Sequence, residues 1–341
     1  MDSITQIVLG AAVGEAILGR HLGNKALLLG AIAGTLPDMD IVMKLYDNTP
    51  LFEIKSHRSY SHSGFVHLAI SVPLAWLSIK WSKTSLSFSR WYLFWFLGLF
   101  THALLDCCTT YGTRLFLPFS SNLVAFNNIS VIDPLYTLPF LLLLIVMMFF
   151  KRNTMARKKL FYSAIVVSSM YMAFTFLAKF IVHQKFKKSL VNSGIVVDNL
   201  NSTPTILNAI LWCGIAVNQD FLYSAEYSFF RPQVPIKWVA YPRNLQLVDS
   251  FDSDAMRTLH WFSDGMFFII PDGYSKARYF NAKFGKMNYT ETAPEKAFLF
   301  YAEFDKDSAN RVEFSFKTPS SQRAKQDFGK MFHSLTDRIG L

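Results

Sequence analysis

The chain has 341 residues, of which 51% are hydrophobic and 16% aromatic, and it carries a formal net charge of +10. So apolar and Phe-rich a composition excludes an ordinary soluble domain and is typical of a membrane protein. Residues 1–182 contain 15 Lys and Arg against 8 Asp and Glu, so much of the basic excess lies beside apolar segments, where basic loops face an anionic leaflet. No basic-aromatic stripe accompanies the charge, so we expect a lipid bilayer and no nucleic acid as partner.

The first half of the chain is a series of apolar segments that we expect to be helices in a lipid bilayer. Residues 4–19 and 26–36 are short for spanning helices, and Pro37 stops or kinks the second. The longer apolar segments are residues 64–81, 91–108, 138–150 and 160–182. Together they predict a multi-pass α-helical membrane domain over residues 1–182.

The distribution of basic residues orients this domain. Residues 151–159, KRNTMARKK, form the most basic loop and are expected on the cytoplasmic side of the inner membrane. Counting back through the apolar segments places the loops that contain Arg20 and Arg90 on the same side. The stretches rich in His and Asp then all fall at the opposite, outer face, where they can form one composite site.

Residues 183–341 have a different character, because strand-like runs alternate there with turns. These runs are residues 221–230, 236–241, 265–270, 276–284, 296–304 and 311–317. Helices are expected at residues 254–263 and 321–335. The pattern predicts a smaller soluble α+β domain with an antiparallel sheet. If residues 160–182 span the membrane, this domain is extracytoplasmic.

His102 and Asp106 are metal-ligand residue types within an apolar segment. Their spacing, i and i+4 in HALLD, places both on one face of a helix. Ionisable groups are costly inside a bilayer and usually have a function there. The pair can therefore grip a metal ion; the alternative is a His–Asp hydrogen bond that stabilises the helix bundle.

Two further stretches supply similar groups. PDMD presents Asp38 and Asp40 after a proline, and HRSYSHS contains His57 and His62. Histidines five residues apart diverge on a straight helix, so a turn must bring them together. Arg58 between them suits a phosphate or carboxylate oxygen, because its planar fork donates two parallel hydrogen bonds. The alternatives are a solvated turn for the aspartates and a surface loop for the histidines.

Five motifs in order resemble the YdjM-like family of inner-membrane proteins, which are assigned as metal-dependent hydrolases. The motifs lie within roughly residues 1–150 and are MDSITQIVLGAAVGEAILGR, GAIAGTLPDMD, HRSYSHS, HALLDCCTTYGTRLFLPFS and IDPLYTLPFLL. The spaced His and Asp residues are also similar, more weakly, to those of zinc-dependent phospholipase C proteins. The resemblance implies metal ligands at Asp38, Asp40, His57, His62, His102 and Asp106, with Gln6, Glu15 and Arg58 nearby. Gln6 departs from the family, in which His is expected at this position in many members.

We therefore expect a membrane-bound metal-dependent hydrolase at the outer membrane–water boundary. The six ligand candidates would hold one or two divalent ions, with zinc as the expected metal, and such ions activate water. Glu15 is a candidate general base and Arg58 a candidate binding group for an amphiphilic phosphoester such as a lipid headgroup. Two alternatives remain open, an ion-binding transporter and a noncatalytic membrane protein with a structural metal.

Overall fold

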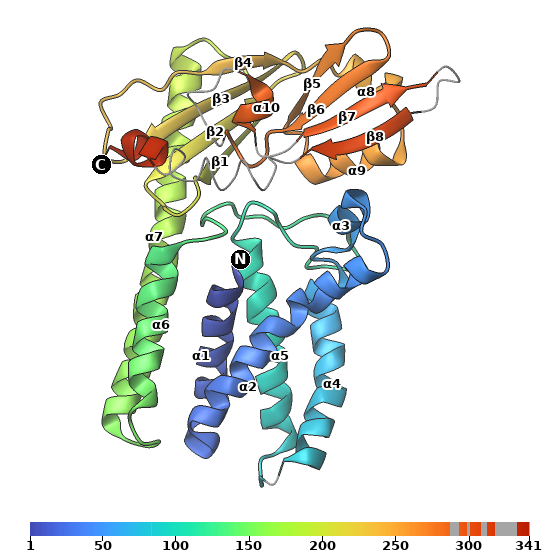
Figure 1. Ribbon diagram of the computed structural model, residues 1–341. Helices are drawn as coiled ribbons and strands as arrows, with labels where there is room; N and C mark the ends of the chain where they lie inside the picture. The colour runs from blue at the N-terminus through green and yellow to red at the C-terminus, as the bar shows by residue number, and fades with distance from the viewer. Residues whose placement is uncertain (83, 287–292, 299–300, 308–311, 318–332, 341) are drawn as a thin grey trace. The chain divides into compact units, whose positions relative to one another are not determined.

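The computed structural model describes the whole chain except residues 83, 287–292, 299–300, 308–311, 318–332 and 341. The described residues divide into two compact units, residues 1–176 and 177–341. The first is helical and the second contains two antiparallel sheets (Figure 1). The predicted fold class, a helical membrane domain followed by an α+β domain, is confirmed.

The first unit contains helices joined mostly by short connections. They are α1 (Ser3–Leu22), α2 (Asn24–Thr35), η1 (Leu36–Leu45), α3 (Pro50–Ser56), η2 (Tyr60–His62), α4 (Gly64–Trp81), α5 (Phe88–Cys107), α6 (Pro134–Met148) and the start of α7 (Met155–Asn192). Among the described residues, three segments are long and apolar enough to cross a membrane, namely Asn24–Leu45, Gly64–Trp81 and Met155–Asn192, and α6 is a shorter apolar helix. Large exposed side chains on these segments, such as Leu28, Trp76 and Met170, suit contact with lipid.

Helices α1 and α2 form a tight hairpin because glycines line their interface. Gly23 makes the turn with φ 57°, a conformation that glycine adopts without steric cost. A Cβ on Gly10 would lie 2.3 Å from the carbonyl oxygen of Gly30, and one on Gly14 would lie 2.0 Å from that of Ala26. Small residues allow this close backbone approach between membrane helices. The hairpin thereby fixes the end of α2, from which the chain enters η1.

Helix α5 packs against this hairpin and against α4. Phe94 and Trp91 of α5 are buried with Leu18 of α1 and Ala33 of α2. The segments η1 and η2 contact each other; α2 contacts η1, α4 contacts η2, and α5 contacts both. One end of the helical unit is therefore built from three helix termini.

The second unit contains two four-stranded antiparallel sheets, ordered β1-β2-β3-β4 and β5-β6-β7-β8. The strands are β1 (Asn199–Pro204), β2 (Leu211–Val217), β3 (Phe221–Ser228), β4 (Val239–Pro242), β5 (Phe267–Asp272), β6 (Lys276–Asn281), β7 (Tyr301–Lys306) and β8 (Val312–Lys317). Stacked Phe268 and Phe280, with ring centroids 4.9 Å apart, belong to a core that also holds Ile215 and Leu222 of the first sheet. Aromatic pairs of this kind add to the stabilisation from buried area.

Most of the expected strands in this unit are present. The structure adds two strands that were not predicted, and it has a helix where one predicted strand begins. Strands β1 and β2 lie outside the predicted runs, and residues 294–297 form the short helix α10 (Pro294–Ala297) before β7 begins. The expected helix at 254–263 is α9 (Asp254–Ser263), which Ser253 caps at its N-terminus; α8 (Gln246–Ser250) precedes it. The helix expected at 321–335 lies largely outside the described residues.

Candidate metal centre

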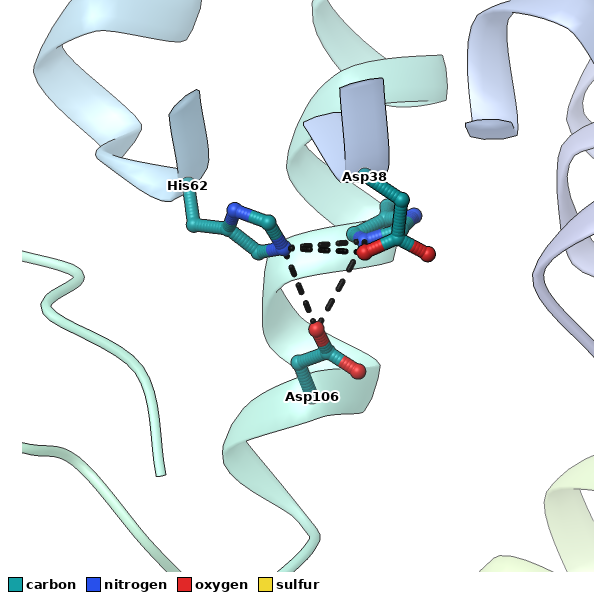
Figure 2. Close-up of side chains that lie close together, drawn as sticks. Asp38, His62 and Asp106 are labelled. Atoms are coloured by element: carbon teal, nitrogen blue, oxygen red, sulfur yellow. Dashed lines mark hydrogen bonds and ion pairs between the residues drawn. The ribbon is translucent and has the colours of Figure 1, made fainter. Parts of the chain in front are cut away.

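Four side chains converge at the end of the helical unit formed by the three helix termini. They are Asp38, His62, His102 and Asp106, and each offers a ligand atom within 4.8 Å of the others. Figure 2 shows Asp38, His62 and Asp106 directed toward a common point. His62, His102 and Asp106 are buried, whereas Asp38 is partly exposed. The sequence-based expectation that stretches far apart in the chain supply one group of ligands agrees with this geometry.

Local structure explains how each ligand reaches the cluster. His102 and Asp106 lie one turn apart near the end of α5. Asp38 follows Pro37 in the first turn of η1, directly beyond α2. His62 is the last residue of η2, and Ser63 then caps α4 by accepting a hydrogen bond from the backbone N–H of Val66. Each ligand is thus held by the start or end of a helix.

The distances between ligand atoms match those expected around a tetrahedral ion. Nε2 of His62 is 3.1 Å from Nε2 of His102, 3.5 Å from Oδ1 of Asp38 and 3.2 Å from Oδ2 of Asp106. Nε2 of His102 is 3.4 Å from the Asp38 oxygen and 3.5 Å from the Asp106 oxygen. Bonds of about 2.0–2.1 Å to a tetrahedral zinc ion place its ligand atoms about 3.3 Å apart. These five separations are therefore those expected around one such ion, and all four ligand atoms lie within 4.8 Å of one another.

Hydrogen bonds orient both imidazoles with Nε2 toward the cluster. The Nδ1 atom of His102 lies 2.6 Å from the carbonyl oxygen of Gly34, which can only accept. Nδ1 of His62 lies 2.9 Å from Oγ of Ser61, and that hydroxyl donates to Asp40. Both Nδ1 atoms are therefore donors, and in the neutral imidazoles both Nε2 atoms carry lone pairs.

Asp106 also presents an atom without a hydrogen-bond partner to the cluster. Its Oδ1 accepts a hydrogen bond from Nε2 of Gln6 at 3.0 Å and contacts the Met1 amine, whereas its buried Oδ2 accepts none. This oxygen has an ion-pair partner in Nε of Arg58 at 3.0 Å, and a metal ion at the cluster would give it a further one. The cluster thus offers lone pairs from two imidazole nitrogens and two carboxylate oxygens. These are ligand atoms that suit a divalent metal such as zinc.

Asp40 and His57 lie beside this group of four and not within it. Both oxygens of Asp40 are 3.2 Å from Nδ1 of His57, and Oδ2 also accepts from the backbone N–H of Arg58 and from Ser61. Asp40 therefore orients His57 directly and His62 through the Ser61 hydroxyl. These two residues support the cluster and border it, a position that differs from the direct coordination the resemblance implies.

Arg58 is buried against the cluster. Its Nε is 3.0 Å from Oδ2 of Asp106, and its Nη1 donates to the Thr109 hydroxyl at 3.0 Å. Its backbone has φ 52°, the left-handed region that non-glycine residues rarely adopt. The ring of Tyr111 lies 5.0 Å from the guanidinium carbon, and burial raises the pKa of this phenol. The guanidinium is thus engaged with a candidate ligand, which leaves less of it for a substrate than expected from sequence.

Glu15 is not brought to the cluster. Its two carboxylate oxygens each accept a hydrogen bond of 2.7 Å from Arg157 of α7. It lies nine residues beyond Gln6 on α1, or about 13 Å along the helix axis. The geometry therefore gives Glu15 no part in chemistry at the four-residue cluster.

A pocket of about 360 Å³ lies beside the cluster. Asp38, Asp40, His57 and Arg58 line it together with Lys44 and Glu53. Lys44 and Glu53 form an exposed ion pair at 2.6 Å. The partly exposed face of the cluster thus opens on a space bordered by groups of both charges.

Sequence reasoning did not assign Ser61, Thr109 or Tyr111 to the site. Ser61 links Asp40 to His62, Thr109 accepts from Arg58, and Tyr111 packs edge-on against His57 with ring centroids 5.3 Å apart. Each lies within five residues of a predicted ligand, so proximity in sequence was the available signal. Their roles depend on the turn at Arg58 and on the end of α5, which the sequence pattern does not reveal.

Comparison with known proteins gives one match. A family model described as YdjM inner membrane protein matches residues 1–182, which include the whole cluster. No curated protein and no solved structure matches the chain.

Proposed function

The chain belongs to the YdjM inner membrane protein family, and we propose that it is a metal-dependent hydrolase acting on a phosphoester of an amphiphilic substrate. The observation that carries this proposal is the group of four acceptor atoms, two from imidazoles and two from carboxylates, in which each imidazole nitrogen lies 3.1 to 3.5 Å from the other three atoms, beside a pocket. The possible metal cluster and the membrane family support its coarse features. The hydrolytic reaction and the substrate class are our inference from donor chemistry and location.

Asp38, His62, His102 and Asp106 would hold the ion. A bound divalent ion supplies Lewis acidity, which makes water a nucleophile at neutral pH and polarises a phosphoryl oxygen. Asp106 is oriented by Gln6 and Arg58, and His102 by the Gly34 carbonyl. Such outer hydrogen bonds keep ligands in position and usually matter for metal affinity.

His57 replaces Glu15 as our candidate for proton transfer. Its Nδ1 faces the Asp40 carboxylate at 3.2 Å, and the residue lines the pocket next to Asp38. A carboxylate at one ring nitrogen fixes the tautomer and leaves the other nitrogen to exchange a proton. His57 would accept a proton from the attacking water and return it to the leaving oxygen.

The pocket also suits a charged headgroup. Lys44 and Arg58 line it, and both can attract a phosphate oxygen, Arg58 through its remaining N–H groups and Lys44 as a point charge. The cluster lies at helix ends, where a headgroup in the membrane–water boundary would meet it. We place this end on the outer side of the inner membrane, because residues 151–159 are the most basic loop.

A structural metal is the second candidate function. Four protein ligands, three of them buried, are typical of closed structural zinc sites. The partial exposure of Asp38 to the pocket favours catalysis, because a carboxylate at the open side can make room for water. Transport is less favoured, since transport sites lie near the bilayer midplane and these ligands lie at helix ends.

Activity of the metal-loaded protein in detergent tests the proposal. Purified protein is assayed against soluble phosphomonoesters and phosphodiesters and against phospholipid headgroups, with His57→Gln compared with His260→Gln in the second unit. We expect metal-dependent release of product, lost in His57→Gln at unchanged metal content and retained in the control. If the fully metal-loaded protein cleaved no substrate in the panel, the hydrolase proposal would be refuted in favour of a structural metal.

A further inference from the structure

A second pocket of about 280 Å³ lies at the other end of α1 from the metal cluster. Residues from the last turns of α1, the first turn of α5 and the start of α7 line it. All of them belong to the helical unit. Arg20 is fourteen residues beyond Gln6, or about 21 Å along α1, so this pocket is separate from the proposed catalytic site.

The lining of this pocket is strongly basic. Its cationic side chains are Arg20, Arg90, Arg157 and Lys158, joined by His21. Glu15 is the one carboxylate among the lining residues that the structure describes, and Arg157 already holds both of its oxygens at 2.7 Å. Asn24 accepts a further hydrogen bond from Arg157 at 2.7 Å, so that guanidinium is saturated. Among the described residues that line the pocket, no other carboxylate compensates the positive charge of the three remaining side chains.

These uncompensated groups come from three different helices. Arg20 lies in the last turn of α1 and Lys158 in the first turn of α7. Arg90 lies in the first turn of α5 and contacts the ring of His21. Like charges from three elements repel one another when they share one hollow. An anion in the pocket would convert that repulsion into attraction and join the three helix ends.

Apolar side chains complete the lining. Ile17, Phe161 and Tyr162 border the same space as the basic groups, and α7 is one of the segments able to span a membrane. A phospholipid combines an anionic phosphate with acyl chains, so it matches both parts of this lining. Basic pockets between spanning helices at the cytoplasmic side are suited to anionic headgroups.

We propose that this pocket binds the phosphate of an anionic phospholipid. The bound lipid would place its phosphate among Arg20, Arg90 and Lys158 and its acyl chains along Phe161 and Tyr162. Free inorganic phosphate shares the headgroup chemistry but gains nothing from the apolar side. The inference is independent of metal binding and of hydrolysis at the opposite end of α1.

Native mass spectrometry of the full-length protein released from detergent tests the proposal. Phosphatidylglycerol, phosphatidylcholine and inorganic phosphate are titrated separately, and bound adducts are counted. Arg20→Gln/Arg90→Gln removes two charges from the pocket. The matched control, Lys151→Gln/Lys159→Gln, removes two charges from the neighbouring basic stretch 151–159, and neither residue lines the pocket.

We expect phosphatidylglycerol to bind the wild-type protein and the control with the same affinity. Its affinity for the pocket variant should be roughly tenfold or more lower, because each basic group near a headgroup contributes about a fivefold effect or more in affinity. Lys158→Gln alone should give a smaller loss, which keeps the test valid if the double variant folds poorly. Equal binding by the pocket variant and the wild type overturns the proposal. So does an equal loss in the control, which would indicate diffuse surface charge. Retention of inorganic phosphate without preference for phosphatidylglycerol overturns the lipid assignment.

Discussion

Replacement of His102 by Ala should remove most of the metal affinity while the helical unit stays folded. His102 supplies one of four converging acceptor atoms, and its Nε2 lies 3.1 to 3.5 Å from the other three. Structural zinc sites have apparent binding free energies of roughly 10–16 kcal/mol. One ligand of four therefore accounts for about 3 kcal/mol if the contributions are equal, which is on the order of a hundredfold in affinity.

The measurement combines metal analysis of the purified protein with a competition titration against a chelator. His260→Ala is the matched control, because it removes an imidazole from α9, outside the helical unit. Circular dichroism and elution as a single species establish that His102→Ala is folded. A folded His102→Ala protein that binds zinc within about threefold of the wild-type affinity would refute the assignment of the cluster, since a lost ligand costs far more than that.

Four further predictions follow from the same geometry. Asp106→Asn should lower zinc affinity about as strongly as His102→Ala, by removing a charged ligand; unchanged stoichiometry in the folded variant would contradict this. Arg58→Lys should weaken metal binding about tenfold, because Lys cannot both reach Oδ2 of Asp106 and bond Thr109; chelator competition measures the loss. Gly30→Val should destabilise the helical unit by about 1–3 kcal/mol, because its Cβ would lie 2.1 Å from the Gly10 carbonyl oxygen; an unchanged melting temperature in detergent would argue against the close hairpin. A cysteine at the exposed position of Ser250 should react with an impermeant thiol reagent added outside the cell, and labelling only after the inner membrane is opened would reverse the proposed orientation.

Features set by residues close together in the sequence could be predicted, whereas features set by contacts between distant residues could not. The pairing of His102 with Asp106 follows from helical periodicity alone, because four residues make about one turn. The choice of His62 over His57 does not follow from spacing. It depends on the positive φ of Arg58 and on the single turn of η2, which together reverse the chain and direct only the second imidazole at Asp106.

Interactions between distant residues account for the other differences. Glu15 accepts hydrogen bonds from Arg157, which is 142 residues away, and no local sequence pattern predicts such a pair. Strand β1 has the sequence NLNSTP, whose polar residues and proline resemble a turn. Strand β2, LWCGIAV, is buried at every position, so it lacks the alternation by which a half-buried strand is recognised. Its pairing with two neighbours, which only the tertiary structure supplies, makes it a central strand.

The four converging ligand atoms determine which experiments can separate a catalytic from a structural metal ion. Lone pairs on His62 and His102 and oxygens of Asp38 and Asp106 all lie within 4.8 Å of one another and repel unless a cation or shared protons lie between them. Because these ligands come from helix termini and the turns that flank them, an ion that satisfies them also ties those termini together. Both a catalytic and a structural ion would therefore raise the melting temperature, and chelation would lower it in either case. Stability measurements cannot distinguish the two roles, whereas groups that border the cluster without contributing a ligand can. His57 is held by Asp40 and lines the pocket. It would transfer protons in the proposed hydrolysis but is not a ligand of a closed structural site, so the effect of its replacement on turnover is the measurement that decides between the two roles.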